Sequence, residues 1–165
     1  MSNASYYSLL NNGKLTGDVI GAVEATPPVS ATGATLTCTM DTHAGRTIVI
    51  SAVAGCAVTL PAATGTGSVY RFIIGATITS NSTTIKVANT TDVMSGRAFV
   101  ISDGAAAVLG YATGATSDTI TLNGTTLGGL IGDHIEIIDA IAGTFAVRVF
   151  TAATGTEATP FSATV

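Results

Sequence analysis

The stretch ATGTGSVYRFIIGATITSN, residues 63–81, alternates at its centre between two sets of side chains, as a β-strand does. Both faces of this alternation are largely apolar: Tyr70, Phe72 and Ile74 share one face, while Val69 and Ile73 flank Arg71 on the other. The Gly, Thr, Ser and Asn residues on either side are typical of turns. The stretch therefore predicts a strand with one charge, Arg71, in the middle of its second face.

Similar runs continue along the chain from residue 34 onward. Short segments rich in Val, Ile, Thr, Tyr and Phe are separated by Gly, Asn, Asp and Ser, which is the pattern of consecutive strands and turns. About ten strands are expected, at residues 35–40, 46–52, 56–60, 68–75, 83–88, 97–102, 106–111, 117–122, 133–139 and 143–150. The sequence therefore predicts an all-β domain over residues 34–165, either a β-sandwich or a jelly-roll-like barrel.

Three local features of this domain can also be predicted. One helical turn is expected at residues 92–94, capped by Thr90 or Thr91. The Asn123–Gly124 pair favours a tight hairpin. The aspartates are too widely spaced for the dense alternating ligands of a calcium loop, so most of them are expected to cap turns.

Residues 1–33 differ from the rest of the chain, because small polar residues and Pro27–Pro28 replace the alternating pattern. Apolar residues occur there mainly as isolated pairs: Tyr6 and Tyr7, Leu9 and Leu10, and Val19 and Ile20. The segment is therefore predicted to be an extended N-terminal arm. Its six paired apolar residues are candidate interface contacts, because a terminal segment is ordered only where something holds it.

The amino-acid composition argues against two classes of partner, nucleic acids and membranes. Charged residues make up 10% of the 165 residues, against roughly 25% in ordinary soluble domains, so hydroxyl groups, Gly and Ala are expected to cover the surface. The net charge is −4 and the six basic residues are scattered singly, which argues against a nucleic-acid surface. No apolar run approaches the roughly 18 residues of a membrane helix, and no stretch resembles a secretion signal, so no membrane partner is expected.

No motif for catalysis, cofactor binding or metal binding is recognisable. His43 and His134 lack the spacing of a metal motif, and residues 63–68 lack the Gly-Lys-Ser/Thr ending of a phosphate loop. The sequence also has no Gly-x-Ser-x-Gly elbow. Cys38 and Cys56 are expected to be buried free thiols, with a disulfide across paired strands as the alternative. The sequence thus predicts a protein that is not an enzyme and has no cofactor.

Three predicted strands each carry a charged residue in the middle of a largely apolar face: Arg71, Glu136 and Arg148. Burying one such charge without a partner would cost on the order of several kcal/mol. Partners could come from an Arg–Glu network between neighbouring strands of one chain, or from pairing across a subunit interface. The sequence leaves both arrangements open, and all three residues are candidate interface residues.

Three segments of the chain resemble small structural proteins of tailed bacteriophages: residues 58–88, 119–139 and 145–163. In this family a Leu-Pro turn, here Leu60–Pro61, leads to a Tyr-Arg/Lys-Phe strand, and an Ala-Thr-Pro-Phe-Ser sequence closes the chain, here residues 158–162. Relatives often have Trp where this chain has Phe145, a change that loses an N–H donor. The resemblance covers roughly the last two thirds of the sequence.

By its size, its expected β content and its first segment, the chain resembles the head decoration, or capsid cement, proteins of this class. The resemblance implies a virion protein that is made in the host cytoplasm and lies on the capsid exterior. There it would bind and stabilise the shell of the major capsid protein as a homotrimer. The alternative is a head-fibre or tail-associated module that binds a host glycan. The absence of Trp weighs against that alternative, because glycan sites usually stack sugars on exposed aromatic rings.

Overall fold

The computed structural model describes residues 10–11, 14–15, 27–104 and 107–165, and its side chains are described for the body, residues 27–104 and 107–165. The short strands β1 (Leu10–Asn11) and β2 (Lys14–Leu15) pair with each other in antiparallel fashion. The elements of the body are β3 (Val29–Ala31), β4 (Thr35–Thr37), α2 (Met40–His43), β5 (Thr47–Ile50), β6 (Ala57–Thr59), β7 (Val69–Ile74), β8 (Thr83–Lys86), β9 (Val93–Ser102), β10 (Val108–Ala112), β11 (Thr119–Leu122), β12 (His134–Ile141), β13 (Thr144–Ala153) and β14 (Phe161–Ser162).

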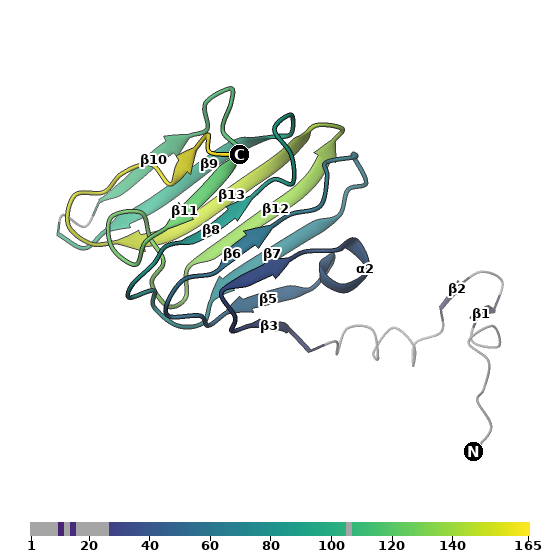
Figure 1. Ribbon diagram of the computed structural model, residues 1–165, viewed down its shortest axis with the longest axis horizontal. Coiled ribbons are helices and arrows are strands. Elements are labelled where there is room, and N and C mark those ends of the chain that lie inside the picture. Colours follow the sequence, from purple (N-terminus) through teal and green to yellow (C-terminus); the bar gives the residue numbers. More distant parts are fainter. Residues whose placement is uncertain (1–9, 12–13, 16–26, 105–106) are drawn as a thin grey trace, which may run out of the picture.

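The body is a β-sandwich of two mixed sheets stacked face to face (Figure 1). The seven-stranded sheet has the order β10-β9-β13-β12-β7-β5-β3, and the five-stranded sheet has the order β14-β11-β8-β6-β4. The strand axes of the two sheets are roughly aligned with each other in Figure 1, as in aligned sheet packing. The prediction of an all-β sandwich is therefore confirmed.

One apolar core lies between the two sheets. Its main side chains are at most 2% exposed and come from the inward faces of both sheets: Tyr70, Phe72, Ile74, Ile135, Ile137, Phe145, Val147 and Val149 from the seven-stranded sheet, and Val58, Ile85, Ile120 and Leu122 from the five-stranded sheet. The inward residues of each long strand form one of the two faces into which the alternation of its sequence divides the side chains. Burial of these large side chains is the main source of stability for the sandwich.

All ten expected strands are present, with shifted ends. The strands β3 and β14 were not expected: β14 has only two residues, and β3 directly follows Pro27–Pro28. Residues Val29–Ala31 fall in the segment assigned to the arm, but they pair in parallel with β5 and form an edge strand of the seven-stranded sheet.

The candidate contacts of the arm fall largely outside the described residues. Leu10 belongs to β1 and is the register partner of Leu15. The other five contacts lie outside the described part of the chain: Tyr6, Tyr7, Leu9, Val19 and Ile20. Their role as interface residues stays a prediction.

Two local predictions are wrong. The expected helical turn at residues 92–94 is instead the start of β9, while the short helix α2 follows β4. Asp92 is buried before β9, where its carboxylate accepts the backbone N–H of Ala63 at 2.7 Å. The Asn123–Gly124 pair does not form a tight hairpin, because the chain passes there from β11 in one sheet to β12 in the other. In both segments the conformation depends on residues distant in the sequence, and the local preferences of turn residues do not predict such contacts.

Four buried aspartates accept backbone N–H groups from loops: Asp92, Asp118, Asp133 and Asp139. Asp133 caps its own turn, as the sequence predicts, whereas the other three bind residues distant in the sequence. Asp118 accepts the N–H of Thr164 at 2.8 Å and so fastens the segment after β14, and Asp133 accepts the N–H of Gly129 at 2.6 Å. Burial raises the pKa of Asp133. Burial also acts on Asp118, but the N–H and hydroxyl donors around that carboxylate outweigh it and hold the pKa of Asp118 below its ordinary value.

The cysteines and the first histidine are structural. Cys38 and Cys56 are buried free thiols, as predicted. Burial and the neighbouring Cys56 raise the pKa of Cys38 to about 12, so this thiol stays protonated near neutral pH. His43 is buried at the end of α2, where its Nδ1 accepts the N–H of Thr39, the N-cap residue, at 3.0 Å.

Candidate interaction surface

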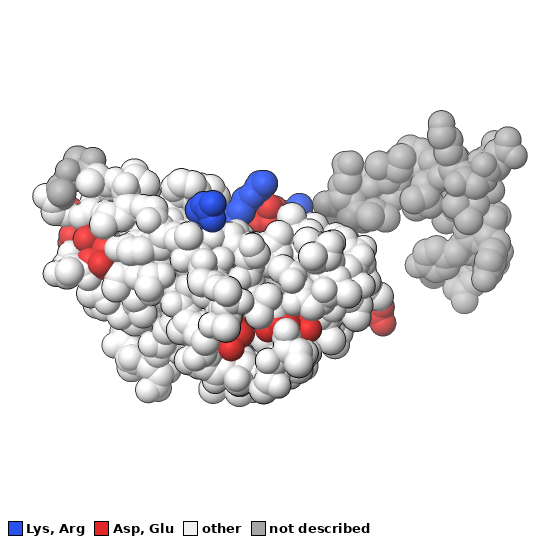
Figure 2. All heavy atoms as spheres, turned by 90° about the horizontal axis from the view of Figure 1, so that it is seen from above, with Lys and Arg blue, Asp and Glu red and all other residues white. Residues whose placement is uncertain are grey.

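The outer face is the surface of the seven-stranded sheet that points away from the core. A row of charged residues crosses it, because the strand register places them opposite one another. Arg97 of β9 is the register partner of Arg148 of β13, Arg148 is that of Glu136 of β12, and Glu136 is that of Arg71 of β7. We call these four residues the arginine row. In Figure 2, basic side chains gather along the upper side of the body around an acidic one.

Glu136 holds two of the arginines. The Nε of Arg71 donates to Oε2 of Glu136 at 3.3 Å, and Nη1 of Arg148 lies 3.9 Å from Oε1 of Glu136. The side chains of Arg71, Glu136 and Arg148 are 42%, 23% and 71% exposed, so water screens both contacts. Each exposed pair contributes roughly 0.2 to 1 kcal/mol. The structure thus brings the three predicted residues together, in the Arg–Glu network within one chain.

Arg97 is the member of the row that the sequence analysis missed. Its side chain is exposed, and its Nη1 donates to the carbonyl oxygen of Gly96 at 3.3 Å. Arg97 joins the row because β9 pairs in parallel with β13, a strand far away in the sequence. The alternating pattern places Arg97 within a strand but carries no information about which strand lies beside it.

An apolar cluster lies next to the arginine row. Phe99 and Phe150 stack with ring centroids 5.3 Å apart and an interplanar angle of 14°, and they are 42% and 50% exposed. Ile101 and Val108 are register partners that extend the cluster toward the edge strand β10, and both are more than half exposed. The apolar cluster, defined by these four residues, is therefore open to solvent in the single chain.

The outer face has a shallow depression of about 550 Å³, which is lined by members of the arginine row and by the two stacked phenylalanines. Small residues make room for it: Ser95, Gly96 and Ala146. Larger side chains surround it: Arg97, Phe99, Glu136, Ile138, Arg148 and Phe150. The depression thus combines cationic hydrogen-bond donors with aromatic rings, an arrangement that can bind an anionic group and an adjacent apolar group together.

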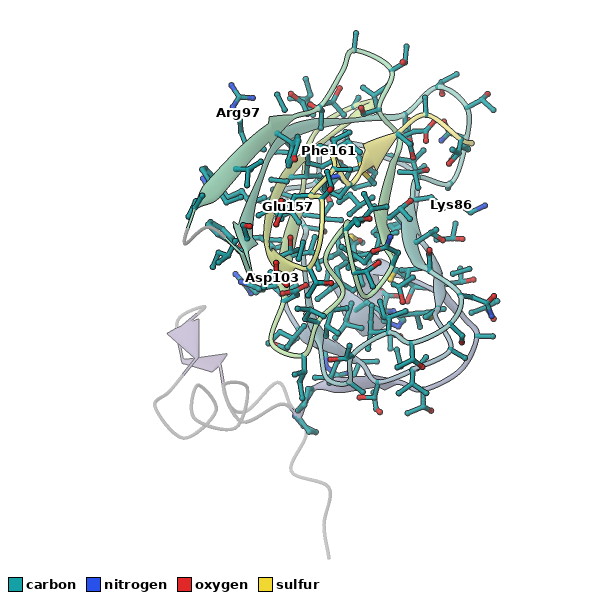
Figure 3. The ribbon with its side chains drawn as sticks, turned by 90° about the vertical axis from the view of Figure 1, so that its left-hand side faces the viewer. Lys86, Arg97, Asp103, Glu157 and Phe161 are labelled. Carbon is teal, nitrogen blue, oxygen red and sulfur yellow. The ribbon has the colours of Figure 1, made fainter. Side chains whose placement is uncertain are left out.

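The opposite surface of the sandwich has different chemistry. The outward positions of the five-stranded sheet carry mainly hydroxyl groups: Thr35, Thr37, Thr59, Thr84, Thr121 and Ser162. Lys86 is a charged residue on that sheet. In Figure 3, Arg97 and Lys86 point away from the body on opposite sides. The stacked phenylalanines and the clustered arginines are therefore features of the outer face, and the described strands of the five-stranded sheet carry no large exposed apolar side chain.

Replacing Arg71 with leucine tests whether this residue also contacts another subunit. The free energy of unfolding, measured with denaturant, is expected to fall by less than about 1 kcal/mol, because exposed ion pairs contribute little. If Arg71 lies in a subunit interface, light scattering will show a smaller oligomer for the variant than for the wild type. Glu136→Gln is the matched variant, since it removes the same ion pair from the other side. An unchanged mass in both variants would exclude an essential subunit contact through this pair.

The described part of the chain contains no group of three or more His, Cys, Asp and Glu side chains placed to hold a metal ion. None of its helices is long and apolar enough to cross a membrane. Comparison with protein-family models, with curated proteins and with solved structures found no match. Function must therefore be inferred from the chemistry of the surfaces.

Proposed function

We propose that this protein is a virion structural protein that decorates the capsid of a tailed bacteriophage and stabilises the shell of the major capsid protein. The observation that carries the proposal is the outer face of the seven-stranded sheet. It collects three of the arginines and four of the large exposed apolar side chains of a chain in which only 10% of residues are charged. The resemblance of three segments to phage structural proteins gives this surface its expected partner.

The size of the outer face supports binding to a protein. Seven strands spaced about 4.8 Å apart make a sheet roughly 30 Å wide, and the ten-residue strands β9 and β13 are about 33 Å long. The available area is therefore at most about 1,000 Å². A stable protein interface covers about 800 Å² on each partner, so the face is large enough.

The proposal includes a homotrimer located on the capsid exterior. Linking three copies makes the second and third contacts with the shell effectively intramolecular, so modest individual contacts can raise the overall affinity 10²-fold or more, an estimate for linked binding modules. The hydroxyl-covered surface of the five-stranded sheet suits the side that faces water, because it presents few exposed apolar side chains.

Copy number in purified virions tests the proposal. Quantitative mass spectrometry should find this chain at close to the number of capsid subunits, because a decoration protein occupies repeated sites over the whole shell. The major capsid protein of the same sample is the internal standard. Absence of the chain from mature heads would refute the proposal.

A second candidate is a head-fibre or tail-associated module that binds a host glycan. The specific observation in its favour is the exposed Phe99–Phe150 pair beside Arg97 and Arg148, because sugars stack on aromatic rings and accept hydrogen bonds from arginine. The same copy-number measurement separates the two functions. Tens of copies or fewer in each virion, the number expected for fibres and tail modules, would favour the glycan-binding module.

A further inference from the structure

We propose that the outer face recognises an acidic protein surface, whose carboxylates bind Arg97 and Arg148 and whose apolar side chains pack against Phe99 and Phe150. The inference rests on the proposed function, because it places that acidic surface on the major capsid protein. It goes further by naming the chemistry of the contact and the residues that carry it.

The charge of the outer face gives the first argument. The arginine row contains three arginines and one glutamate, so its formal charge is +2, although the whole chain has a net charge of −4. A partner that covers this row must supply negative charge, since burying unpaired arginines is costly. Two outer faces stacked on each other would place cationic rows in contact, and like charges across an interface are unfavourable. A second copy of the same face is therefore a poor occupant.

The two ends of the arginine row differ in whether a carboxylate already pairs closely with the guanidinium group. Arg71 is held by its hydrogen bond to Glu136 at 3.3 Å. Arg148 is 71% exposed and lies 3.9 Å from Glu136, and the hydrogen bond of Arg97 uses one donor of its guanidinium, to the Gly96 carbonyl. Each of these last two side chains keeps donors that can bind a carboxylate in bidentate fashion. The anion-binding end of the row is therefore at β9 and β13.

The apolar cluster lies at this same end. Phe99 and Phe150 border the depression that Arg97 and Arg148 also line. Gly110, the register partner of Phe99 on β10, has open space above it, since a Cβ there would meet no atom within 4 Å. An apolar side chain of the partner can therefore pack beside Phe99 while a neighbouring carboxylate reaches an arginine. Interfaces commonly combine aromatic and arginine contacts in this way.

The extent of the surface favours a protein over a saccharide. The apolar cluster reaches beyond the depression to Ile101 and Val108, which are 56% and 62% exposed. A saccharide bound in the depression would leave these two residues uncovered, whereas a protein surface would bury them along with the phenylalanines. The favoured occupant is therefore a carboxylate-bearing protein surface with apolar residues beside the acidic ones.

Binding to heads that lack this chain tests the inference. The full-length protein is added to such heads at several salt concentrations, and bound protein is measured after sedimentation. Wild-type binding should weaken as salt rises. The Arg97→Gln, Arg148→Gln double variant should bind about tenfold more weakly or worse, since each lost charge-assisted hydrogen bond is a large effect. Lys86→Gln, which removes a positive charge from the other sheet, is the matched control and should bind like the wild type.

Glu136→Gln provides an effect of opposite sign. It removes the negative charge of the arginine row, so association with heads at low salt should become faster than for the wild type. Thermal unfolding of all variants checks that they are folded, which is expected because the substituted side chains lie at the surface.

The outcomes separate the two proposals. If wild-type protein does not bind heads under any condition, the proposed function fails. If it binds, but the double variant binds equally well and salt has no effect, decoration stands and the acidic-surface inference is overturned. The inference is also overturned if the arginine substitutions leave head binding unchanged while abolishing binding to an acidic saccharide such as an oligogalacturonate, which would assign the depression to a glycan.

Discussion

The Asp139→Ala variant is expected to lose about 3 kcal/mol of unfolding free energy, because it removes a buried carboxylate together with the charge-assisted hydrogen bonds that this carboxylate accepts. The carboxylate of Asp139, at 3% exposure, accepts the N–H of Gly65 at 2.8 Å, the N–H of Thr66 at 3.0 Å and the hydroxyl of Thr66 at 2.7 Å. These bonds attach the loop that precedes β7 to strand β12. The strands β7 and β12 carry Arg71 and Glu136. Denaturant unfolding at pH 7 measures the loss, which is a large share of the roughly 5–15 kcal/mol typical of a domain.

The same substitution should change how stability depends on pH. Burial by itself would raise the pKa of Asp139, but the N–H groups of Thr66 and Gly65 and the Thr66 hydroxyl outweigh it and hold the pKa below its ordinary value. A lowered folded pKa means that the carboxylate contributes stability above its unfolded pKa of about 3.9, and that this contribution is lost as pH falls through the folded pKa. The difference between wild type and Asp139→Ala should therefore shrink below about pH 4.

Two further variants make this prediction specific. Asp139→Asn keeps one acceptor oxygen but turns an amide NH₂ toward backbone donors, so its stability should lie between those of the wild type and the alanine variant. Asp103→Ala is the control, because it removes an exposed carboxylate in the loop that follows β9. It should change the unfolding free energy by no more than about 0.5 kcal/mol. A wild-type to Asp139→Ala difference that stays constant from pH 7 to pH 3 would contradict the proposed linkage.

Gly96→Ala is expected to lower the unfolding free energy by about 2–3 kcal/mol, because β9 and β13 approach too closely there for a side chain. A Cβ built on Gly96 would lie 1.8 Å from the carbonyl oxygen of Val147, its register partner, so one of the two backbones must shift. That shift would also disturb the alignment of Arg97 with Arg148. The variant should therefore weaken binding to heads as well as stability.

Gly110→Ala is the matched control for Gly96→Ala, since Gly110 lies on the adjacent strand of the same sheet. A Cβ at Gly110 would meet no atom within 4 Å, so the substitution should change the unfolding free energy by no more than about 0.5 kcal/mol. Equal stability of the two variants in denaturant unfolding would show that the close approach of β9 and β13 is not a constraint.

The strands themselves could be predicted because their information is local. Alternation with a period of two residues divides the side chains of β7, β12 and β13 correctly into two faces, and one face of each strand is buried in the core. Glycine-rich and hydroxyl-rich segments between these runs marked the turns. The predictions that failed, a helical turn at residues 92–94 and a hairpin at Asn123–Gly124, concerned segments whose conformation depends on another part of the fold, such as the Asp92 bond to Ala63.

The candidate surface could be predicted only in part. Arg71, Glu136 and Arg148 were recognisable because each interrupts an apolar face of a strongly alternating strand. Two properties of these residues were not recognisable: that they are exposed, and how many ion-pair partners each has. Alternation does not say which face of a strand the second sheet covers. Phe150 was recognisable as apolar on that face, but its stacking with Phe99 depends on the parallel pairing of β13 with β9.

Residue order alone was sufficient to predict an all-β chain with few charges and ten strands, because these properties follow from composition and from neighbours along the chain. Strand order required the folded molecule, since β9 and β13 lie far apart in the sequence and are brought together by the burial of their inward faces in one core. That pairing sets Arg97 beside Arg148 and Phe99 beside Phe150, and so creates the surface on which the proposed function depends.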